Sequence, residues 1–182
     1  SEKQVADRLE MLMRQAGAEK GSFDAIVASG PHGAQGHAKP DGRPLVDAQP
    51  IVVDWGAAGR FYISDLTRVL SLRTITAKLE AVYKVVLKAQ ERAIQKIRPG
   101  IKGQAVDAEA RATIEKSGFG RFFTHSTGHG IGLDVHEAPA LRPNSDAILR
   151  PGMVVTVEPG IYIRGWGGVR IEDDVLVTRT GH

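Results

Sequence analysis

The sequence predicts an α+β protein whose two halves repeat one pattern of helix and short antiparallel strands. Apolar residues recur at helical spacing in three segments, and short β-rich runs punctuated by glycine and proline fill much of the rest. A third observation is an internal repeat that relates the two halves. A chain of 182 residues can bury one good core, so we expect residues 1–182 to form a single domain.

Three helices follow from the spacing. Residues 2–16 read as an amphipathic helix that stops at Gly17, a long helix ends at Pro99-Gly100, and a shorter one ends near Gly118. The apolar positions that mark them are Val5, Leu9, Leu12 and Ala16; Leu79, Val82, Val86, Ala93 and Ile97; and Val106, Ala110 and Ile114. The expected strands are Ile51 to Val53, Phe61 to Ile63, Val154 to Val157, Ile161 to Ile163 and Val175 to Val177.

The repeat also matches chemically active residues. GHAKP (Gly36 to Pro40) lies opposite VHEAP (Val135 to Pro139), so each half has a histidine at this point. Further along, two carboxylates of the first half lie opposite two of the second: Asp54 and Asp65 match Glu158 and Glu172.

The carboxylates within each half have the spacing of a hairpin. Asp54 and Asp65 are 11 positions apart, and Glu158 and Glu172 are 14 apart. Because neighbouring strands of a hairpin place side chains on a common face, each pair can reach one point. We therefore expect the two hairpins to form a cage of four carboxylates.

The repeat is unequal at its start. The second half has a long helix before its short one, whereas the first half begins directly with the short helix. We expect the chain to be N-terminally truncated, a fragment that lacks an upstream helix and a preceding N-terminal domain.

Composition excludes several functional classes. The net charge is only +3, with lysine and arginine scattered among acidic residues, so we expect no nucleic-acid partner and no membrane partner. The absence of cysteine excludes disulfides and thiolate chemistry and fits a cytoplasmic protein. No apolar run approaches the roughly 20 residues of a membrane helix, and Ser1 to Glu10 lacks the layout of a signal peptide.

Four converging carboxylates need cations, because like charges in close contact cannot all stay ionised. Carboxylates suit Mn²⁺, and one imidazole from His129 also admits Co²⁺ or Zn²⁺. Glycines on both sides of His129 allow its backbone to approach a metal cluster closely. Two divalent ions about 3.5–4 Å apart catalyse amide hydrolysis in aminopeptidases.

Each residue alone has a simpler interpretation. A single carboxylate is usually a solvated loop acid, and Glu172 could belong to a charged hairpin end. His37 and His136 stand in glycine- and proline-rich segments where a histidine is usually just exposed. His125 and His129 are four apart, but the surrounding glycines argue against a helical zinc pair.

Four motifs together resemble the pita-bread metallopeptidases, and the resemblance spans essentially the whole chain. They are VVDWGAAGRFYISDLTR (Val52 to Arg68), STGHGIGLDVHEAP (Ser126 to Pro139), TVEPGIY (Thr156 to Tyr162) and GVRIEDDVLVT (Gly168 to Thr178). Within that family the chain resembles prolidases and Xaa-Pro aminopeptidases most closely. The resemblance implies a pseudo-twofold antiparallel sheet with helices packed outside.

The resemblance also implies a reaction, the hydrolysis of the bond between an N-terminal residue and proline in a di- or oligopeptide. The nucleophile would be a hydroxide that bridges two metal ions. The implied metal ligands are Asp54, Asp65, His129, Glu158 and Glu172, with Asp65 and Glu172 bridging two ions. Glu158 would be the acid/base, and His37 and His136 would bind the scissile carbonyl. Arg170 would orient a carboxylate by a forked hydrogen bond, and His125 and Tyr162 would also support the ligands or the substrate.

Three alternatives stay open. A methionine aminopeptidase would share the metal site, whereas a creatinase-like enzyme or a metal-free peptide-binding module would share only the fold. Typical prolidases carry an additional N-terminal domain that helps form dimers, and this chain does not contain it, so the state of a possible homodimer is open.

Overall fold

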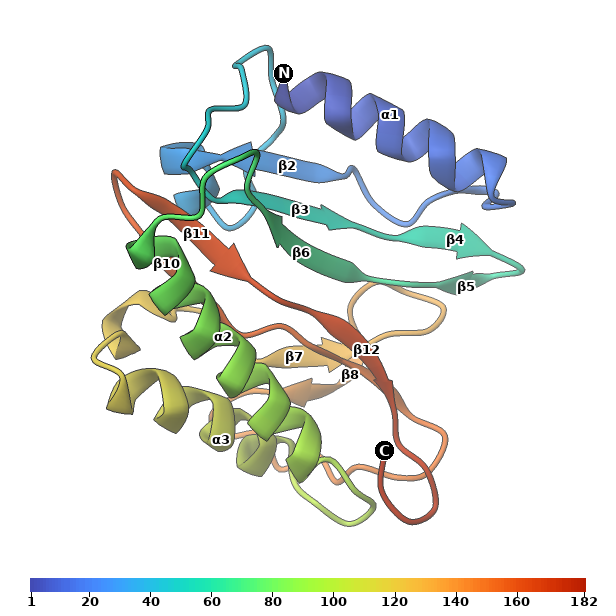
Figure 1. Ribbon diagram of the computed structural model, residues 1–182. Helices are drawn as coiled ribbons and strands as arrows, with labels where there is room; N and C mark the ends of the chain where they lie inside the picture. The colour runs from blue at the N-terminus through green and yellow to red at the C-terminus, as the bar shows by residue number, and fades with distance from the viewer.

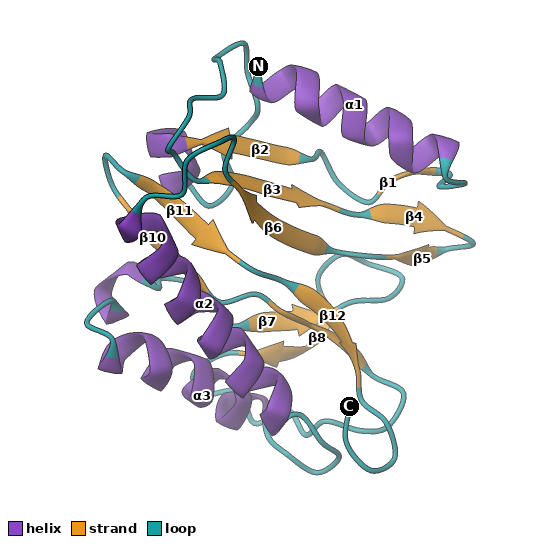
Figure 2. Cartoon of the chain, viewed as in Figure 1, coloured by secondary structure: helices purple, strands orange, loops and turns teal.

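A computed structural model describes all 182 residues and confirms the α+β architecture. The chain forms two stacked halves, with strands of both halves lying between α1 on one side and the pair α2 and α3 on the other (Figures 1 and 2). No helix combines the length and the apolar character that crossing a membrane requires.

The first half contains one α-helix, a 3₁₀ turn and six short strands. Its elements are α1 (Glu2–Gln15), β1 (Lys20–Gly21), β2 (Ile26–Ser29), η1 (Gly30–Ala34), β3 (Ile51–Trp55), β4 (Ala57–Gly59), β5 (Tyr62–Ile63) and β6 (Leu66–Leu70). Helix α1 begins with a capping box, in which the Ser1 hydroxyl accepts from the Gln4 backbone and the Gln4 side chain reaches back to Ser1. Its buried face rests on strands β2 and β3 through Ala6, Val27 and Val53.

The second half contains two α-helices and six strands. Its elements are α2 (Ala77–Lys96), α3 (Gly103–Lys116), η2 (Gly120–Phe122), β7 (Gly128–Gly130), β8 (Glu137–Leu141), β9 (Val154–Val157), β10 (Gly160–Ile163), β11 (Gly167–Arg170) and β12 (Asp173–Leu176). The helices pack against one another and against strands β9 to β12, and this contact forms the main core of 19 buried residues.

All strand pairs are antiparallel. The first half has the order β2-β3-β6 with a smaller sheet β1-β4-β5, and the second has β12-β9-β7-β8 with the separate hairpin β10-β11. An isolated antiparallel β-bridge between Thr67 and Glu172 connects the two halves. Arg68 strengthens this connection by donating to the Glu172 carbonyl at 2.6 Å.

The three sequence-predicted helices are all present, with ends that differ from the prediction by one to three residues. The prediction of β9 is correct at both ends, but Phe61 lies in the turn of its hairpin and Val177 lies beyond β12, so these two strand boundaries were wrong. Phe61 has a φ of 72°, which a tight turn requires and an extended strand does not allow.

Seven of the twelve strands were not predicted, namely β1, β2, β4, β6, β7, β8 and β11. Strand β7 is a Gly-His-Gly run, and β8 contains a proline, so neither has the β-branched alternation that marks a strand. Pairing with the neighbouring strands makes them extended despite their composition.

Candidate metal centre

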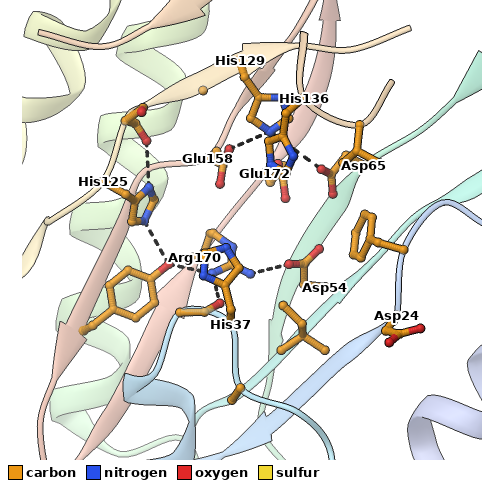
Figure 3. A pocket seen from close by; sticks show the side chains of 18 of the residues that line it. Asp24, His37, Asp54, Asp65, His125, His129, His136, Glu158, Arg170 and Glu172 are labelled. Carbon is orange, nitrogen blue, oxygen red and sulfur yellow. Dashed lines mark hydrogen bonds and ion pairs between the residues drawn. The ribbon is translucent and has the colours of Figure 1, made fainter. Parts of the chain in front are cut away.

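A cleft of about 590 Å³ opens between the two halves, and all ten sequence-predicted site residues line it. They are His37, Asp54, Asp65, His125, His129, His136, Glu158, Tyr162, Arg170 and Glu172. Figure 3 shows the carboxylates and histidines of this group turned toward one another from strands of both halves.

Strand pairing brings the carboxylates together as the hairpin spacing predicts. Asp54 lies in β3 and is paired with Thr67 of β6, two residues after Asp65. In the second half, Val157 of β9 is paired with Asp173 of β12, which places Glu158 and Glu172 side by side just beyond the paired strands. The bridge between the halves then brings the two pairs into one site.

Three of these residues form a compact group of ligand atoms. One side-chain atom from each of Asp65, His129 and Glu172 lies within 4.8 Å of the other two, close enough to hold one metal ion. His129 Nε2 also lies 3.2 Å from Glu158 Oε1 and 3.9 Å from Asp65 Oδ2. The imidazole is oriented by its other nitrogen, since Nδ1 lies 3.0 Å from the Gly130 carbonyl oxygen.

Two carboxylate oxygens in the cleft have no hydrogen-bond partner. Asp54 Oδ1 and Asp65 Oδ1 are both buried, although the second oxygen of Asp54 accepts a hydrogen bond from Arg170. A buried acceptor without a donor is costly, and a cation would satisfy both oxygens. The donor set of four carboxylates and one imidazole therefore fits divalent metal ions.

The pKa shifts of the cleft carboxylates are those expected of a site that binds cations. Burial raises the pKa of Asp65 to about 8, and the negative charges of Asp54 and Glu158 add to this effect. Burial also raises the pKa of Asp54 and, more strongly, that of Glu172. At Glu158 burial acts in the same direction, but the His129 hydrogen bond and nearby positive charges outweigh it and lower its pKa. Three of the four carboxylates thus resist ionisation until cations bind.

Arg170 is the main cation of the cleft and is buried at 4% exposure. Its guanidinium donates to Asp54, to the Thr67 hydroxyl at 3.0 Å and to the Tyr162 hydroxyl at 2.7 Å. The expected forked contact with a single carboxylate is not formed. Arg170 instead orients Asp54 directly and Glu172 through Thr67, whose hydroxyl donates to Glu172 Oε2 at 2.6 Å.

The other supporting residues extend this network. The Tyr162 hydroxyl lies 3.0 Å from His125 Nε2, so a continuous chain of polar contacts runs from His125 to Asp54 (Figure 3). The ring of His136 lies beside that of His129, with centroids 4.3 Å apart and a tilt of 52° between the two planes, and burial lowers the pKa of His136. His37, on the loop after η1, reaches the cleft from the opposite half.

Two threonines of the site were missed by sequence reasoning. Thr67 connects Arg170 to Glu172, and the Thr156 hydroxyl accepts from the His129 amide at 3.1 Å while lying 3.3 Å from Glu158 Oε1. Both were detectable in principle, because each lies two residues from a proposed ligand, Asp65 or Glu158, and thus on the same strand face.

A family model described as metallopeptidase family M24 matches residues 1–179 of the chain. The chain belongs to metallopeptidase family M24. Its fold is accordingly the pita-bread fold that the motifs predict, with two pseudo-symmetric halves and helices outside.

Relatives of this M24 chain support the closer resemblance. It is 43% identical over 180 residues to the Xaa-Pro dipeptidase of Pyrococcus horikoshii, covering 99% of this chain and 51% of that protein. It superposes with a TM-score of 0.97 on the prolidase from Pyrococcus furiosus, at 42% identity and covering 99% of this chain and 53% of the other. The Xaa-Pro dipeptidase from Bacillus anthracis gives the same TM-score at 48% identity, covering 100% and 51% of the two chains. The chain spans about half the length of these relatives.

Proposed function

We propose that this M24 chain hydrolyses the peptide bond between an N-terminal residue and a following proline. The observation that carries the proposal is the group of Asp65, His129 and Glu172, whose ligand atoms lie within 4.8 Å of one another in a cleft that also holds Asp54 and Glu158. Proteins named Xaa-Pro dipeptidase and prolidase match nearly the whole chain at more than 40% identity, which supports this bond as the substrate.

The five acidic and histidine ligands would hold two divalent ions, with Mn²⁺ as the first choice and Co²⁺ or Zn²⁺ as alternatives. When bound, such ions polarise a carbonyl and lower the pKa of water. The unpartnered oxygens of Asp54 and Asp65 support a site of this kind, because a bound cation would satisfy both of them.

Glu158 is the proposed acid and base. Its lowered pKa keeps it ionised near neutral pH, so it can take a proton from the attacking water. It would then deliver this proton to the leaving imino nitrogen of proline. The Thr156 hydroxyl and the His129 ring, both within 3.3 Å of Glu158 Oε1, fix the carboxylate in place for this transfer.

His37 and His136 are the proposed substrate histidines. They reach the cleft from different halves, His37 from the loop after η1 and His136 from the segment before β8. A lowered pKa keeps His136 neutral at pH 7. A neutral imidazole has one N–H group, which can donate to the scissile carbonyl. Donation strengthens as negative charge develops on that oxygen and so favours the transition state.

The alternatives differ in what they require of the cleft. A metal-free binding module has no physical reason to bury unpartnered carboxylate oxygens, and this observation disfavours it. A methionine aminopeptidase would use the same ligands, so only a substrate panel separates it from an Xaa-Pro peptidase. The cytoplasmic location and the homodimer stay predictions.

The test compares hydrolysis of Ala-Pro, Ala-Pro-Ala and Met-Ala by metal-stripped protein with and without added Mn²⁺. We expect Mn²⁺-dependent cleavage of Ala-Pro, and a Glu158→Gln variant that loses about 10²- to 10⁴-fold in kcat. Cleavage of Ala-Pro-Ala as well would identify an aminopeptidase in place of a dipeptidase. Preferential cleavage of Met-Ala, or activity that survives without metal, would contradict the proposal.

A further inference from the structure

Helix α3 presents an ion pair to the back of the strand that carries His129, with a buried acid, Asp107, and a partly exposed base, Arg111. Asp107 is 2% exposed, and both of its oxygens accept from Arg111, one helical turn later, at 2.9 Å. Neither residue lines the cleft, and the proposed reaction does not use them. An ion pair with a buried carboxylate often stabilises a fold no more than apolar side chains of similar size would, so stability alone does not explain this one.

The ion pair holds one short segment at two points. Asp107 Oδ1 accepts from the Thr127 amide at 3.1 Å and from the Thr127 hydroxyl at 2.8 Å. Arg111 Nη2 donates to the His125 carbonyl at 3.0 Å, and the guanidinium packs 4.4 Å above the centre of the Phe123 ring. The segment that enters β7 is therefore fixed from behind by charge-assisted hydrogen bonds, which are stronger than neutral ones.

Thr127 connects this support to the metal centre. Its carbonyl oxygen accepts from the backbone amide of Glu158 at 2.7 Å. It also stands two residues before His129, so the same short stretch of strand bears one proposed ligand and holds the backbone of another. A shift of Thr127 would move both His129 and Glu158, whose side chains are 3.2 Å apart.

The internal repeat offers a comparison within the molecule. Helices α1 and α3 both have 14 residues, and aligning their ends places Ala6 opposite Asp107. Ala6 meets its sheet by apolar contact alone, with Val27 and Ile51. Strand β2, which pairs with β3, carries no proposed metal ligand, whereas β7 carries His129. Helix α1 contacts β2 through a carboxylate at a different position, since Glu2 at the start of the helix accepts from the Ser29 amide at 2.7 Å. A polar contact at the position of Asp107 therefore occurs only in the second half.

We propose that Asp107, Arg111 and Thr127 form a clamp, here called the α3 clamp, that positions His129 and Glu158 for metal binding and proton transfer. This inference rests on the proposed function for the roles of those two residues. The clamp touches neither substrate nor metal and acts only by setting where the two side chains stand.

The main test is Asp107→Asn, which keeps the side-chain shape but removes its charge and one acceptor oxygen. We expect Mn²⁺ affinity, measured by calorimetric titration, to fall by about 10-fold, and kcat to fall while KM stays within twofold. The matched control is Glu109→Gln on the same helix, because its carboxylate pairs with Lys96 of α2 at 3.1 Å and lies away from β7. The control should keep wild-type Mn²⁺ affinity and kcat.

Two further variants keep the test decisive if Asp107→Asn does not fold. Thr127→Val removes only the hydroxyl contact with Asp107, and Thr127→Ser restores it, so Mn²⁺ affinity should fall in the first and recover in the second. A folded Asp107→Asn or Thr127→Val protein with lowered stability but wild-type Mn²⁺ affinity and kcat would overturn the clamp and leave a structural role only.

A separate measurement distinguishes failure of the clamp from failure of the proposed function. Amide hydrogen exchange in metal-free protein should quicken at His129 and Glu158 in Asp107→Asn and stay unchanged in Glu109→Gln. If the wild-type chain cleaves no peptide or binds no Mn²⁺, the proposed reaction fails, yet this comparison still decides the clamp. Unchanged exchange at both amides would refute it.

Discussion

Arg170 shows how one buried side chain can organise a set of acids. Its guanidinium contacts Asp54, Thr67 and Tyr162 at once, and it also donates to the Gly36 carbonyl at 3.2 Å. Five N–H donors in a planar fork make this possible, and lysine, with a single ammonium, could not reproduce it. Arg170 therefore supplies positive charge to the cleft and also orients Asp54.

Removing this charge should be severe. We expect Arg170→Met to lower the unfolding free energy of the metal-free protein by about 3–5 kcal/mol, because Asp54 would remain buried without its cation. Urea unfolding monitored by circular dichroism measures this directly. Tyr162→Phe is the control, since it removes one hydroxyl that bonds to the same guanidinium and should cost about 1 kcal/mol. Equal losses in the two variants would show that the charge itself matters little.

At the scale of elements, the site depends on the contact between strand β6 and the segment that joins β11 to β12. Thr67 is fully buried there, and its hydroxyl accepts from Arg170 while it donates to Glu172. Arg68, the next residue, ties the same segment from its exposed side through Asp173 at 2.6 Å. The two halves thus meet at the point where the carboxylates of each half converge.

Thr67→Val should damage this junction, because valine has the same shape but can neither accept nor donate. The loss leaves buried polar groups of Arg170 and Glu172 unsatisfied and should cost about 1–3 kcal/mol in unfolding free energy. Mn²⁺ affinity should fall by about 10-fold, since Glu172 loses the group that orients it. Thr113→Val is the matched control, because the Thr113 hydroxyl bonds only to the Glu109 carbonyl within α3. Wild-type Mn²⁺ binding by Thr67→Val would rule out this orienting role.

For the whole molecule, the clustered acids predict an unusual dependence of stability on pH. Asp65 has a folded-state pKa of about 8, far above its unfolded value, and the pKa values of Asp54 and Glu172 are raised as well. Between the unfolded and folded pKa values the folded chain binds more protons than the unfolded one. Stability of the metal-free protein must therefore fall as pH rises through this window. The raised pKa of His129 acts in the same direction.

We expect the urea midpoint of metal-free protein to decrease from about pH 6.5 to about pH 8.5, the range in which Asp65 loses its proton in the folded state. A measurement that begins at about pH 6.5 avoids the protonation of His125, because burial lowers the pKa of this residue. Saturating Mn²⁺ should raise the midpoint and remove most of the slope, because bound cations stabilise the ionised carboxylates. A midpoint that rises with pH in the metal-free protein would contradict the electrostatic account of the cleft.

The helices and part of the sheet could be predicted from local sequence patterns. Helices α1, α2 and α3 follow from apolar periodicity, and β9 from a run of β-branched residues, because both features depend on neighbours in the sequence. Six residues that line the cleft were found by another property, the pairing of equivalent positions in the two halves: His37, Asp54, Asp65, His136, Glu158 and Glu172. A repeated fold brings repeated positions to the same symmetry axis, so the repeat carries information about distant contacts.

Other features had no local signal. Strand β7 is Gly-His-Gly and becomes extended only because β8 and β9 pair with it, and the forked contact expected of Arg170 is replaced by separate contacts on three elements. The α3 clamp likewise joins a helix to a strand 20 residues away in the chain. Residue types and spacing by themselves determined which groups could bind metal, since donor chemistry belongs to the side chain. Only the tertiary structure decided which partner orients each group, because hydrogen bonds require distances and directions that packing alone sets.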